Sequence, residues 1–309
     1  MTSATAFAPA TVANVAVGFD ILGFPVDAVG DEITVSRLDS PTVEIESIEG
    51  IVTELPRDPA KNTATAGLLH MIRDLQLPFG FRVAIKKNIP LGSGMGGSAA
   101  SAVGAVVAAN ALLTDRLTDE QLFSYALVGE EVASGSAHPD NVSPCLLGGL
   151  TLTRSMKPFD VVKIPVNADI LCVLVHPHLR VNTRDARAVL KSEVSMKTFV
   201  QQTANLAAFI AGCHQGDVEL IRRSFKDVVI EPQRAPLIRG FAACQNAALE
   251  AGALGCTISG SGPSLCALAL PGNAEQVKKA VIKVFASLGI ASEGWVSSVR
   301  QEGAKVRPA

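Results

Sequence analysis

The stretch Lys87-Asn-Ile-Pro-Leu-Gly-Ser-Gly-Met-Gly-Gly-Ser-Ala-Ala-Ser101 places four glycines and three serines between an alternating apolar segment and a run of small residues. Glycines allow successive backbone N–H groups to turn toward one anion, and the positive end of a following helix dipole adds to the attraction. The small residues of 98–113 predict a closely packed helix directly after the loop. The stretch therefore predicts a phosphate cradle, with a tight glycine turn that binds nothing as the alternative.

The sequence around the loop argues against three well-known kinds of phosphate-binding loop. Residues 92–97 satisfy the G-x-G-x-x-G spacing of a Rossmann unit, but residues 115–120 lead into another helix where that unit needs a second parallel strand. Gly96-Gly-Ser98 lacks the lysine of a Walker A loop. A protein-kinase loop lies between two hairpin strands, whereas this loop opens a helix. The remaining reading is a nucleotide cradle of another fold, with Ser98 as a hydroxyl for Mg²⁺ or phosphate.

Length and composition limit the class of protein. A chain of 309 residues with 48% hydrophobic residues can form about two domains with substantial cores. Lys and Arg are scattered at a net charge of −2, which is not typical of nucleic-acid binding. No basic residue precedes Arg37, and the most apolar run, 99–113, is shorter than the ~20 residues that span a bilayer. We therefore expect a soluble cytoplasmic protein without a nucleic-acid or membrane partner.

Cysteines and histidines give no metal signature. The six cysteines are widely separated, without a CxxC pair, and lie mostly in apolar segments, which predicts buried free thiols. His176-Pro-His178 follows an apolar strand and has no nearby cysteine or carboxylate cluster. We therefore interpret it as a loop at a strand end rather than a metal site.

The pattern of apolar residues changes near residue 165. Before it, alternation predicts strands at 32–36, 42–47, 81–86 and 160–165, and the segment 5–20 begins as a strand that Pro9, Asn14, Gly18 and Asp20 interrupt. Helices are predicted at 62–77, 98–113 and 118–132, followed by a loop at 135–141 and a strand at 146–153. After it come a strand at 170–175, helices at 183–190, 195–212, 217–225, 235–251 and 274–288, two strands within 255–270, and a last strand near 293–299. We expect two domains, 1–165 and 166–309.

Three motifs in one order resemble the signatures of a known superfamily. They are Pro9-Ala-Thr-Val-Ala-Asn-Val-Ala-Val-Gly-Phe-Asp20, Pro90-Leu-Gly-Ser-Gly-Met-Gly-Gly-Ser-Ala-Ala100 and Ser259-Gly-Ser-Gly-Pro-Ser264. The chain is similar over nearly its whole length to the galactokinase, homoserine kinase, mevalonate kinase and phosphomevalonate kinase (GHMP) superfamily, and the homoserine kinases match best. Two departures are Ala16-Val17-Gly18 in place of Gly-Pro-Gly, and Gly97-Ser98 in place of a double serine.

The resemblance implies an α+β fold of two domains, the first of the ribosomal-protein-S5-like kind and the second ferredoxin-like. It also implies ATP in the glycine loop with its adenine near Asn62, and Mg²⁺ between the phosphates, Ser98 and Glu130. A cation there would offset the cost of Glu130 and Glu131 at a helix C-terminus. The implied nucleotide-binding residues are Asn62, Pro90, Leu91, Gly92, Ser93, Gly94, Met95, Gly96, Gly97, Ser98, Ala99 and Ala100.

The implied activity is ATP-dependent phosphorylation of the side-chain hydroxyl of L-homoserine, a step in threonine biosynthesis. A zwitterionic substrate needs a carboxylate clamp, an ammonium partner and a group that positions the hydroxyl. Guanidinium groups bind carboxylates in a bidentate manner, which suits Arg187 and Arg234. The remaining assignments are Asn14 and Asp20 at the ammonium, Asn141 at the hydroxyl, and His138 at the border. Asn141, Arg234, Glu130 and Thr183 form the expected catalytic set.

Other functions stay open at this point. Taken singly, the same residues are ordinary turn, capping and surface residues. A mevalonate- or shikimate-type kinase is the alternative enzyme, and a non-catalytic nucleotide-binding module on the same fold is the alternative of another class. Some relatives use an Asp/Lys pair as the base, but the sequence does not locate such a pair. We expect catalysis by positioning and charge stabilisation, without a strong general base, and a homodimer as the assembly to consider.

Overall fold

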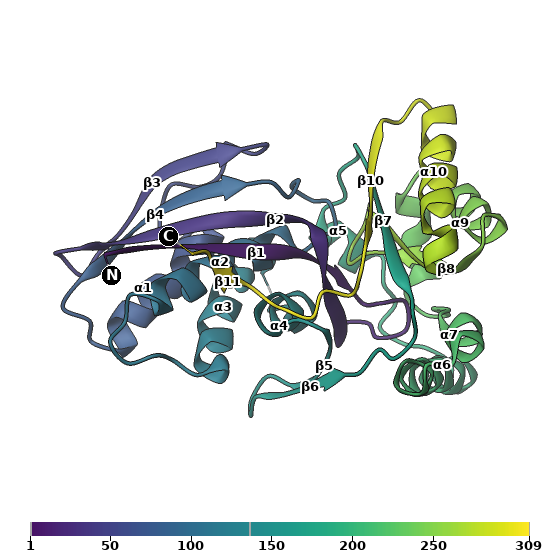
Figure 1. Cartoon of the computed structure of the whole chain (residues 1–309), viewed down its shortest axis with the longest axis horizontal. Helices are drawn as coiled ribbons and strands as arrows, with labels where there is room; N and C mark the ends of the chain where they lie inside the picture. The colour runs from purple at the N-terminus through teal and green to yellow at the C-terminus, as the bar shows by residue number, and fades with distance from the viewer. Residues whose placement is uncertain (1, 136, 309) are drawn as a thin grey trace.

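The structure, a computed structural model, describes residues 2–135 and 137–308 and consists of two sheets, each with helices packed on it (Figure 1). The larger sheet has seven strands among the described residues, in the order β11-β1-β2-β4-β3, with β5 pairing to β2 and β6 to β5. Its pairs are antiparallel except for β3 and β4. Its strands are β1 (Ser3–Ala13), β2 (Leu22–Leu38), β3 (Val43–Gly50), β4 (Gly80–Lys87), β5 (Leu150–Ser155), β6 (Asp160–Ile164) and β11 (Lys305–Val306).

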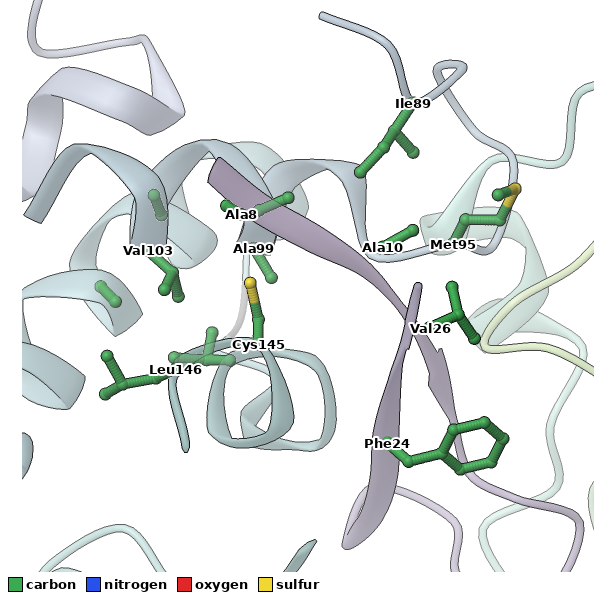
Figure 2. Packing of buried hydrophobic residues seen from close by; sticks show 14 of the residues in the cluster. Ala8, Ala10, Phe24, Val26, Ile89, Met95, Ala99, Val103, Cys145 and Leu146 are labelled. Atoms are coloured by element: carbon green, nitrogen blue, oxygen red, sulfur yellow. The ribbon is translucent and has the colours of Figure 1, made fainter. Parts of the chain in front are cut away.

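Four helices cover one face of this sheet (Figure 1). They are α1 (Thr63–Asp74), α2 (Gly97–Asn110), α3 (Asp119–Ser134) and α4 (Pro139–Leu147). Helix α2 packs against β1 and β2 through small residues, and Figure 2 shows Ala8 of β1 near Ala99 of α2. A Cβ on Gly104 would lie 2.7 Å from Ile33 Cγ1, closer than side chains allow. The small residues of α2 therefore permit the close approach that fixes the glycine loop at the helix start on the sheet.

The second sheet is antiparallel throughout, in the order β10-β7-β9-β8. Helices α9 and α10 pack on it, while α6 and α7 form a pair beside it (Figure 1). The strands are β7 (Leu171–Pro177), β8 (Ala253–Ile258), β9 (Leu265–Ala269) and β10 (Ser292–Ser297). The helical segments are α5 (Thr183–Ala188), α6 (Met196–Gln215), α7 (Val218–Ser224), α8 (Glu231–Arg234), the 3₁₀ turn η1 (Ala235–Leu237), α9 (Phe241–Glu250) and α10 (Pro271–Ser287).

Most of the predicted elements are confirmed to within a few residues, and the exceptions have physical reasons. The strand expected at 32–36 was too short, because β2 begins at Leu22 and continues to pair with β1 as far as Gly23. Strand β1 runs through Pro9, because its pairing register with β2 shifts between Pro9 and Thr11 and the missing N–H is tolerated at that irregularity. The expected loop at 135–141 was wrong in its second half, where α4 begins with a proline in its first turn. The expected strand at 146–153 begins only at Leu150 for the same reason.

The helix expected over 235–251 was also wrong in its first third. Gly240 has a φ of +87° and interrupts the helical path, so that η1 is followed by a separate helix beginning at Phe241. The short elements α8 and β11 were not predicted. Strand β11 pairs with β1, so the end of the chain returns to the first sheet. The division at residue 165 falls between β6 and β7 and stays a prediction.

Two further sequence predictions can be compared with the structure. All six cysteines are buried free thiols, as expected. The loop expected at 176–178 was wrong for its first two residues, because β7 runs to Pro177 and only His178 follows it; His176 is buried, and its Nδ1 lies 3.0 Å from the Ser264 hydroxyl. Across residues 2–135 and 137–308, no helix combines the length and the apolar character that crossing a membrane requires.

Candidate active site

A cavity of about 510 Å³ opens between the two sheets, and most of the predicted site residues line it. Those that do are Asn14, Asp20, Asn62, Pro90, Leu91, Gly92, Ser93, Gly94, Gly96, Gly97, Ser98, Glu130, His138, Asn141, Thr183, Arg187 and Arg234. Met95, Ala99 and Ala100 do not line it, because they are fully buried and support the loop from beneath. Segments distant in sequence therefore meet at one site, and they carry most of the residues that the resemblance implies.

The carbonyl groups of the glycine loop accept hydrogen bonds from other segments of the protein, which hold the loop in place. The four successive carbonyls from Gly92 to Met95 each accept a hydrogen bond from another segment. The donors are Val181 N at 3.3 Å, Ser264 N at 3.1 Å, the Ser259 hydroxyl at 2.7 Å and Thr11 N at 3.1 Å. The backbone N–H groups of 92–96 have no acceptor within the part of the chain that the structure describes. They are consequently available to an anion in the cavity, as a phosphate cradle requires.

Glycine is required in this loop for steric reasons. Gly94 and Gly96 have φ angles of +75° and +66°, which residues with a Cβ rarely adopt. A Cβ on Gly94 would lie 2.3 Å from the Ser259 carbonyl oxygen, and one on Gly96 would lie 2.0 Å from the Thr11 hydroxyl. The loop can therefore form only where glycines allow other segments to approach it.

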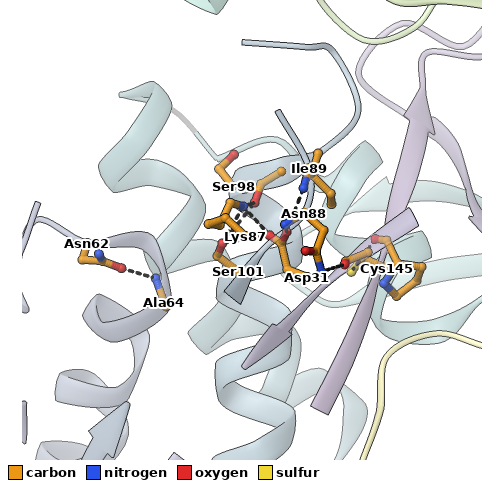
Figure 3. Close-up of polar contacts among 12 residues, drawn as sticks. Asp31, Asn62, Ala64, Lys87, Asn88, Ile89, Ser98, Ser101 and Cys145 are labelled. Atoms are coloured by element: carbon orange, nitrogen blue, oxygen red, sulfur yellow. Dashed lines mark hydrogen bonds and ion pairs between the residues drawn. The ribbon is translucent and has the colours of Figure 1, made fainter. Parts of the chain in front are cut away.

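A buried ion pair between Asp31 of β2 and Lys87 of β4 braces the loop (Figure 3). The Lys87 ammonium also donates to the Gly97 carbonyl at 2.7 Å and to the Ser101 hydroxyl at 2.9 Å, both in α2. The second Asp31 oxygen accepts from the backbone N–H of Asn88 at 2.9 Å and of Ile89 at 3.1 Å. This aspartate and lysine therefore fix both ends of the loop. Sequence reasoning missed the pair because strand register brings the two residues together.

The predicted metal ligands meet at the start of α2. The Ser98 hydroxyl donates to Glu130 Oε2 at 2.7 Å, and His138 Nδ1 lies 3.7 Å from Glu130 Oε1. The hydrogen bond to Glu130 raises the pKa of His138 above its usual value. No cluster of three His, Cys, Asp or Glu residues that could hold a metal occurs within 2–135 and 137–308. Ser98 and Glu130 nevertheless suit Mg²⁺, which takes one or two protein oxygens together with substrate phosphates.

Asp20 and Arg187 form a bidentate ion pair, with distances of 2.9 and 2.8 Å between guanidinium nitrogens and carboxylate oxygens. The expected clamp for the carboxylate and the expected partner of the ammonium are thus bound to each other. Asn14 orders the same loop, because its Oδ1 accepts from Asp20 N at 3.0 Å and its Nδ2 donates to the Gly260 carbonyl at 2.8 Å. Opposite charges are therefore held at one side of the cavity, as a zwitterionic ligand requires.

The loop of the first motif is conformationally unusual. Asn14, Val15, Ala16 and Asp20 all have positive φ angles, of +69°, +45°, +58° and +63°. Such angles cost energy in residues with a Cβ, and they persist only where surrounding contacts enforce them. Ala16 stands where the resembled motif leads us to expect a glycine. This chain therefore reaches a left-handed backbone there despite the substitution.

Arg234 is buried beside the ion pair of Asp20 and Arg187. Its Nε donates to the Ala186 carbonyl and one terminal nitrogen donates to the Gly260 carbonyl, both at 3.0 Å. Burial lowers its pKa, and the neighbouring Arg187 lowers it further. The Arg187 and Arg234 guanidinium carbons each lie 5.1 Å from the centroid of the Phe19 ring. Two arginines converging on one apolar ring provide a site that favours an anionic group.

The remaining predicted residues occupy the walls of the cavity. Asn141 Oδ1 accepts from the Thr11 hydroxyl at 2.7 Å, and the Thr183 and Ser261 hydroxyls lie 3.3 Å apart. Asn62 caps α1 by accepting from Ala64 N at 2.9 Å, and its Nδ2 donates to the Pro56 carbonyl at 2.7 Å. The Asn62 side chain therefore holds the segment before α1 in place beside the cavity.

One ionisable residue of the cavity was not predicted. Asp140 is 3% exposed, and burial, followed by the charge of Asp20, raises its pKa to about 7. Asn141 Nδ2 lies 3.4 Å from its Oδ1. Asp140 was overlooked because 135–141 was expected to be a loop. In the structure it lies in the first turn of α4, a helix that was not predicted.

Family models match segments in both halves of the chain. The family described as GHMP kinases N terminal domain matches residues 62–149, and GHMP kinases C terminal matches residues 208–287. Homoserine kinase from Xylella fastidiosa strain 9a5c is 52% identical, over 98% of this chain and 94% of its own length. Homoserine kinase from Chlorobium phaeobacteroides strain BS1 is 44% identical, over 99% of this chain and 100% of its own length.

Solved structures extend the comparison. A crystal structure of homoserine kinase from Cytophaga hutchinsonii has a TM-score of 0.96 and 45% identity, covering 99% of this chain and 98% of its own. A mevalonate kinase from Staphylococcus aureus MRSA252 shares the fold at a TM-score of 0.63 and 18% identity, covering 97% of this chain and 99% of its own. The chain therefore belongs to the GHMP kinase superfamily and, within it, to the homoserine kinase family. The predicted α+β fold of two ribosomal-protein-S5-like and ferredoxin-like domains is confirmed.

Proposed function

We propose that the chain transfers the γ-phosphoryl group of ATP to the side-chain hydroxyl of L-homoserine, giving O-phospho-L-homoserine for threonine biosynthesis. The main support is that two features line the same cavity. One is the glycine loop, whose N–H groups have no acceptor in the described part of the chain, and the other is the charged group of Asp20, Arg187 and Arg234. An anion cradle facing a site for a zwitterion matches a phosphoryl donor facing an amino-acid alcohol. The activity of the homoserine kinases to which the chain is 43–52% identical supports this assignment.

ATP would occupy the cradle, and it supplies the transferable phosphoryl group. The N–H groups of 92–96 would bind phosphate oxygens, and the start of α2 would add its dipole. Met95, Ala99 and Ala100 would act indirectly, by fixing the loop from the core. The hydrogen bonds from Val181, Ser264, Ser259 and Thr11 keep these donors in place before the ligand arrives, so little reorganisation is needed when charge develops.

We assign Mg²⁺ to the Ser98 hydroxyl and the Glu130 carboxylate. In the present geometry these two groups are hydrogen-bonded, and a cation would replace the shared proton interaction with two oxygen ligands. Glu130 lies five residues before Gly135, the C-cap of α3, and is buried, so that the cation would stabilise its negative charge.

On the acceptor side, we assign Arg187 and Arg234 to the substrate carboxylate, and Asn14 and Asp20 to its ammonium group. Asn141 would position the hydroxyl in line with the phosphorus, with His138 and Thr183 beside it. Phosphoryl transfer requires mainly alignment and charge neutralisation, and no strong general base is included in this assignment. The hydroxyl proton is left to solvent or to a phosphate oxygen.

Three further expectations belong to this proposal. The division into domains 1–165 and 166–309 places the loop and metal ligands in the first and both clamp arginines in the second. Free buried thiols are typical of a reducing compartment, which supports a cytoplasmic location. The assembly included in the proposal is a homodimer, and the proposed binding partners are small molecules.

A coupled assay of ADP release, run with Mg²⁺ and ATP against L-homoserine, mevalonate, shikimate and galactose, tests the function. Turnover with L-homoserine and with none of the others is the expected result. Turnover confined to one of the other alcohols would identify a different GHMP kinase. ATP binding without turnover on any alcohol would identify a non-catalytic nucleotide-binding module. Either of these outcomes contradicts the proposal.

A further inference from the structure

Among the described residues, six lysine and arginine side chains line the cavity, and they differ in how their charges are balanced. They are Lys61, Lys87, Arg180, Arg184, Arg187 and Arg234. Lys87 is paired with Asp31, Arg187 with Asp20, and Lys61 with Asp58 at 3.4 Å, while Arg234 donates to two carbonyls. Within residues 2–135 and 137–308, the guanidinium groups of Arg180 and Arg184 have no hydrogen-bond or carboxylate partner. Two positive charges therefore remain available to a ligand.

Of these two, Arg180 lies against the glycine loop. The next residue, Val181, donates its backbone N–H to the Gly92 carbonyl at 3.3 Å, which fixes this segment beside the loop. A Cβ built on Gly92 would lie 2.7 Å from Arg180 Cγ and 3.2 Å from Arg180 Nε. The stem of Arg180 consequently packs on the first glycine of the cradle, with its exposed end at the cavity.

The cradle itself lacks positive side chains. Residues 88–101 contain no lysine or arginine, and the Lys87 charge is neutralised by Asp31. Backbone N–H groups and Mg²⁺ leave part of the charge of a nucleoside triphosphate to be balanced by other groups. A guanidinium group suits this role, because its planar set of donors binds phosphate oxygens in a bidentate manner.

We propose that Arg180 binds the β- and γ-phosphates of the nucleotide and closes the cradle from the second half of the chain. This inference rests on the proposed function, since it presupposes a nucleotide in the loop. Arg180 would act on the outer phosphates because it packs at Gly92, where the loop begins, and adjoins Asn182 and Thr183 on the cavity wall. Its contribution should therefore depend on how many phosphates the ligand carries.

Isothermal titration with adenosine, AMP, ADP and a non-hydrolysable ATP analogue, all with Mg²⁺, tests this dependence. Arg180→Gln should weaken binding of ADP and the ATP analogue roughly 10- to 100-fold, the effect expected for lost hydrogen bonds to charged groups. Binding of adenosine, AMP and L-homoserine should stay within about threefold of wild type. Arg180→Lys should recover part of the loss, since lysine keeps the charge but not the planar donor set.

Arg184→Gln tests whether a general positive field explains the effect, because Arg184 carries an equally unpaired charge on the same cavity wall; its loss of affinity should be clearly smaller than that of Arg180→Gln. Affinities unchanged in Arg180→Gln would overturn the inference, as would an equal loss in Arg184→Gln, which would indicate a general electrostatic field. If the wild-type protein phosphorylates L-homoserine while Arg180→Gln binds ATP normally, this inference fails and the proposed function stands. If the wild-type protein binds no ATP analogue, the proposed function fails and this inference with it.

Discussion

Lys87 and Asp31 form an ion pair that is removed from solvent, with side-chain exposures of 2% and 0%, between the end of β4 and the middle of β2. The partners of the pair include the first turn of α2 and the backbone that enters the glycine loop. The phosphate cradle is therefore anchored by charge within the core of the first sheet.

Removal of the Lys87 charge should destabilise the protein strongly. Lys87→Met leaves the Asp31 carboxylate buried without its cation, and we expect a loss of about 3–5 kcal/mol in the free energy of unfolding. The double variant Asp31→Asn/Lys87→Met should recover a substantial part. Urea denaturation measures both values. Arg82→Met, which breaks the exposed ion pair with Glu44, is the control and should cost less than about 1 kcal/mol. A similarly small cost for Lys87→Met would contradict the anchoring role.

Arg187 should determine the affinity for the amino-acid substrate and not for the nucleotide. Arg187→Ala removes a bidentate donor and leaves Asp20 without its partner, so we expect KM for L-homoserine to rise by roughly 100-fold. KM for ATP should remain within about threefold. Steady-state kinetics with each substrate varied separates the two effects. Arg222→Ala, in an exposed pair on α7, is the matched control. Equal increases in both KM values would argue against a carboxylate clamp.

The Ser98 hydroxyl should affect metal use without disrupting the cradle. Ser98→Ala retains the backbone N–H groups of the loop but removes one oxygen ligand, so the Mg²⁺ concentration for half-maximal activity should rise roughly tenfold. The measurement is kcat as a function of free Mg²⁺ at saturating ATP. Ser124→Ala, which removes an exposed hydroxyl that bonds only to Glu120 within α3, should behave like wild type. An unchanged Mg²⁺ dependence in Ser98→Ala would show that its hydroxyl is not a ligand, although the cradle could still bind phosphate.

Asp140 should make stability depend on pH between about 4 and 7. Burial raises its pKa from 3.8 to about 7, so the folded protein favours the neutral form. The contribution of neutral Asp140 to the free energy of unfolding is fully present below the pKa of Asp140 in the unfolded chain, and it is lost as the pH rises through about 7. Asp140→Asn remains neutral, so its Tm should approach that of wild type at pH 4 and exceed it at pH 8. Thermal unfolding across that range, without nucleotide, measures the difference. A difference that does not vary with pH would contradict the raised pKa.

Local sequence signals were sufficient for elements whose ends are marked by caps or glycines. Asn62 before α1 and Thr118 before α3 both act as N-caps in the structure. The helical start at Pro139 has an equally local signal, a proline in the first turn, but the polar residues around it are also typical of loops. Local patterns of that kind are ambiguous because the same residues favour a helix start and a turn.

The sequence by itself determined the glycine loop, the small-residue helix behind it and the order of the three motifs, because these depend on backbone freedom and residue size along a continuous segment. Tertiary structure alone decided that Asp31 lies beside Lys87, that Asp20 is bound to Arg187 and that Arg180 packs on Gly92. These contacts join residues 56, 167 and 88 positions apart. They follow from strand register and from the meeting of two sheets at one cavity, which no local pattern of residues encodes.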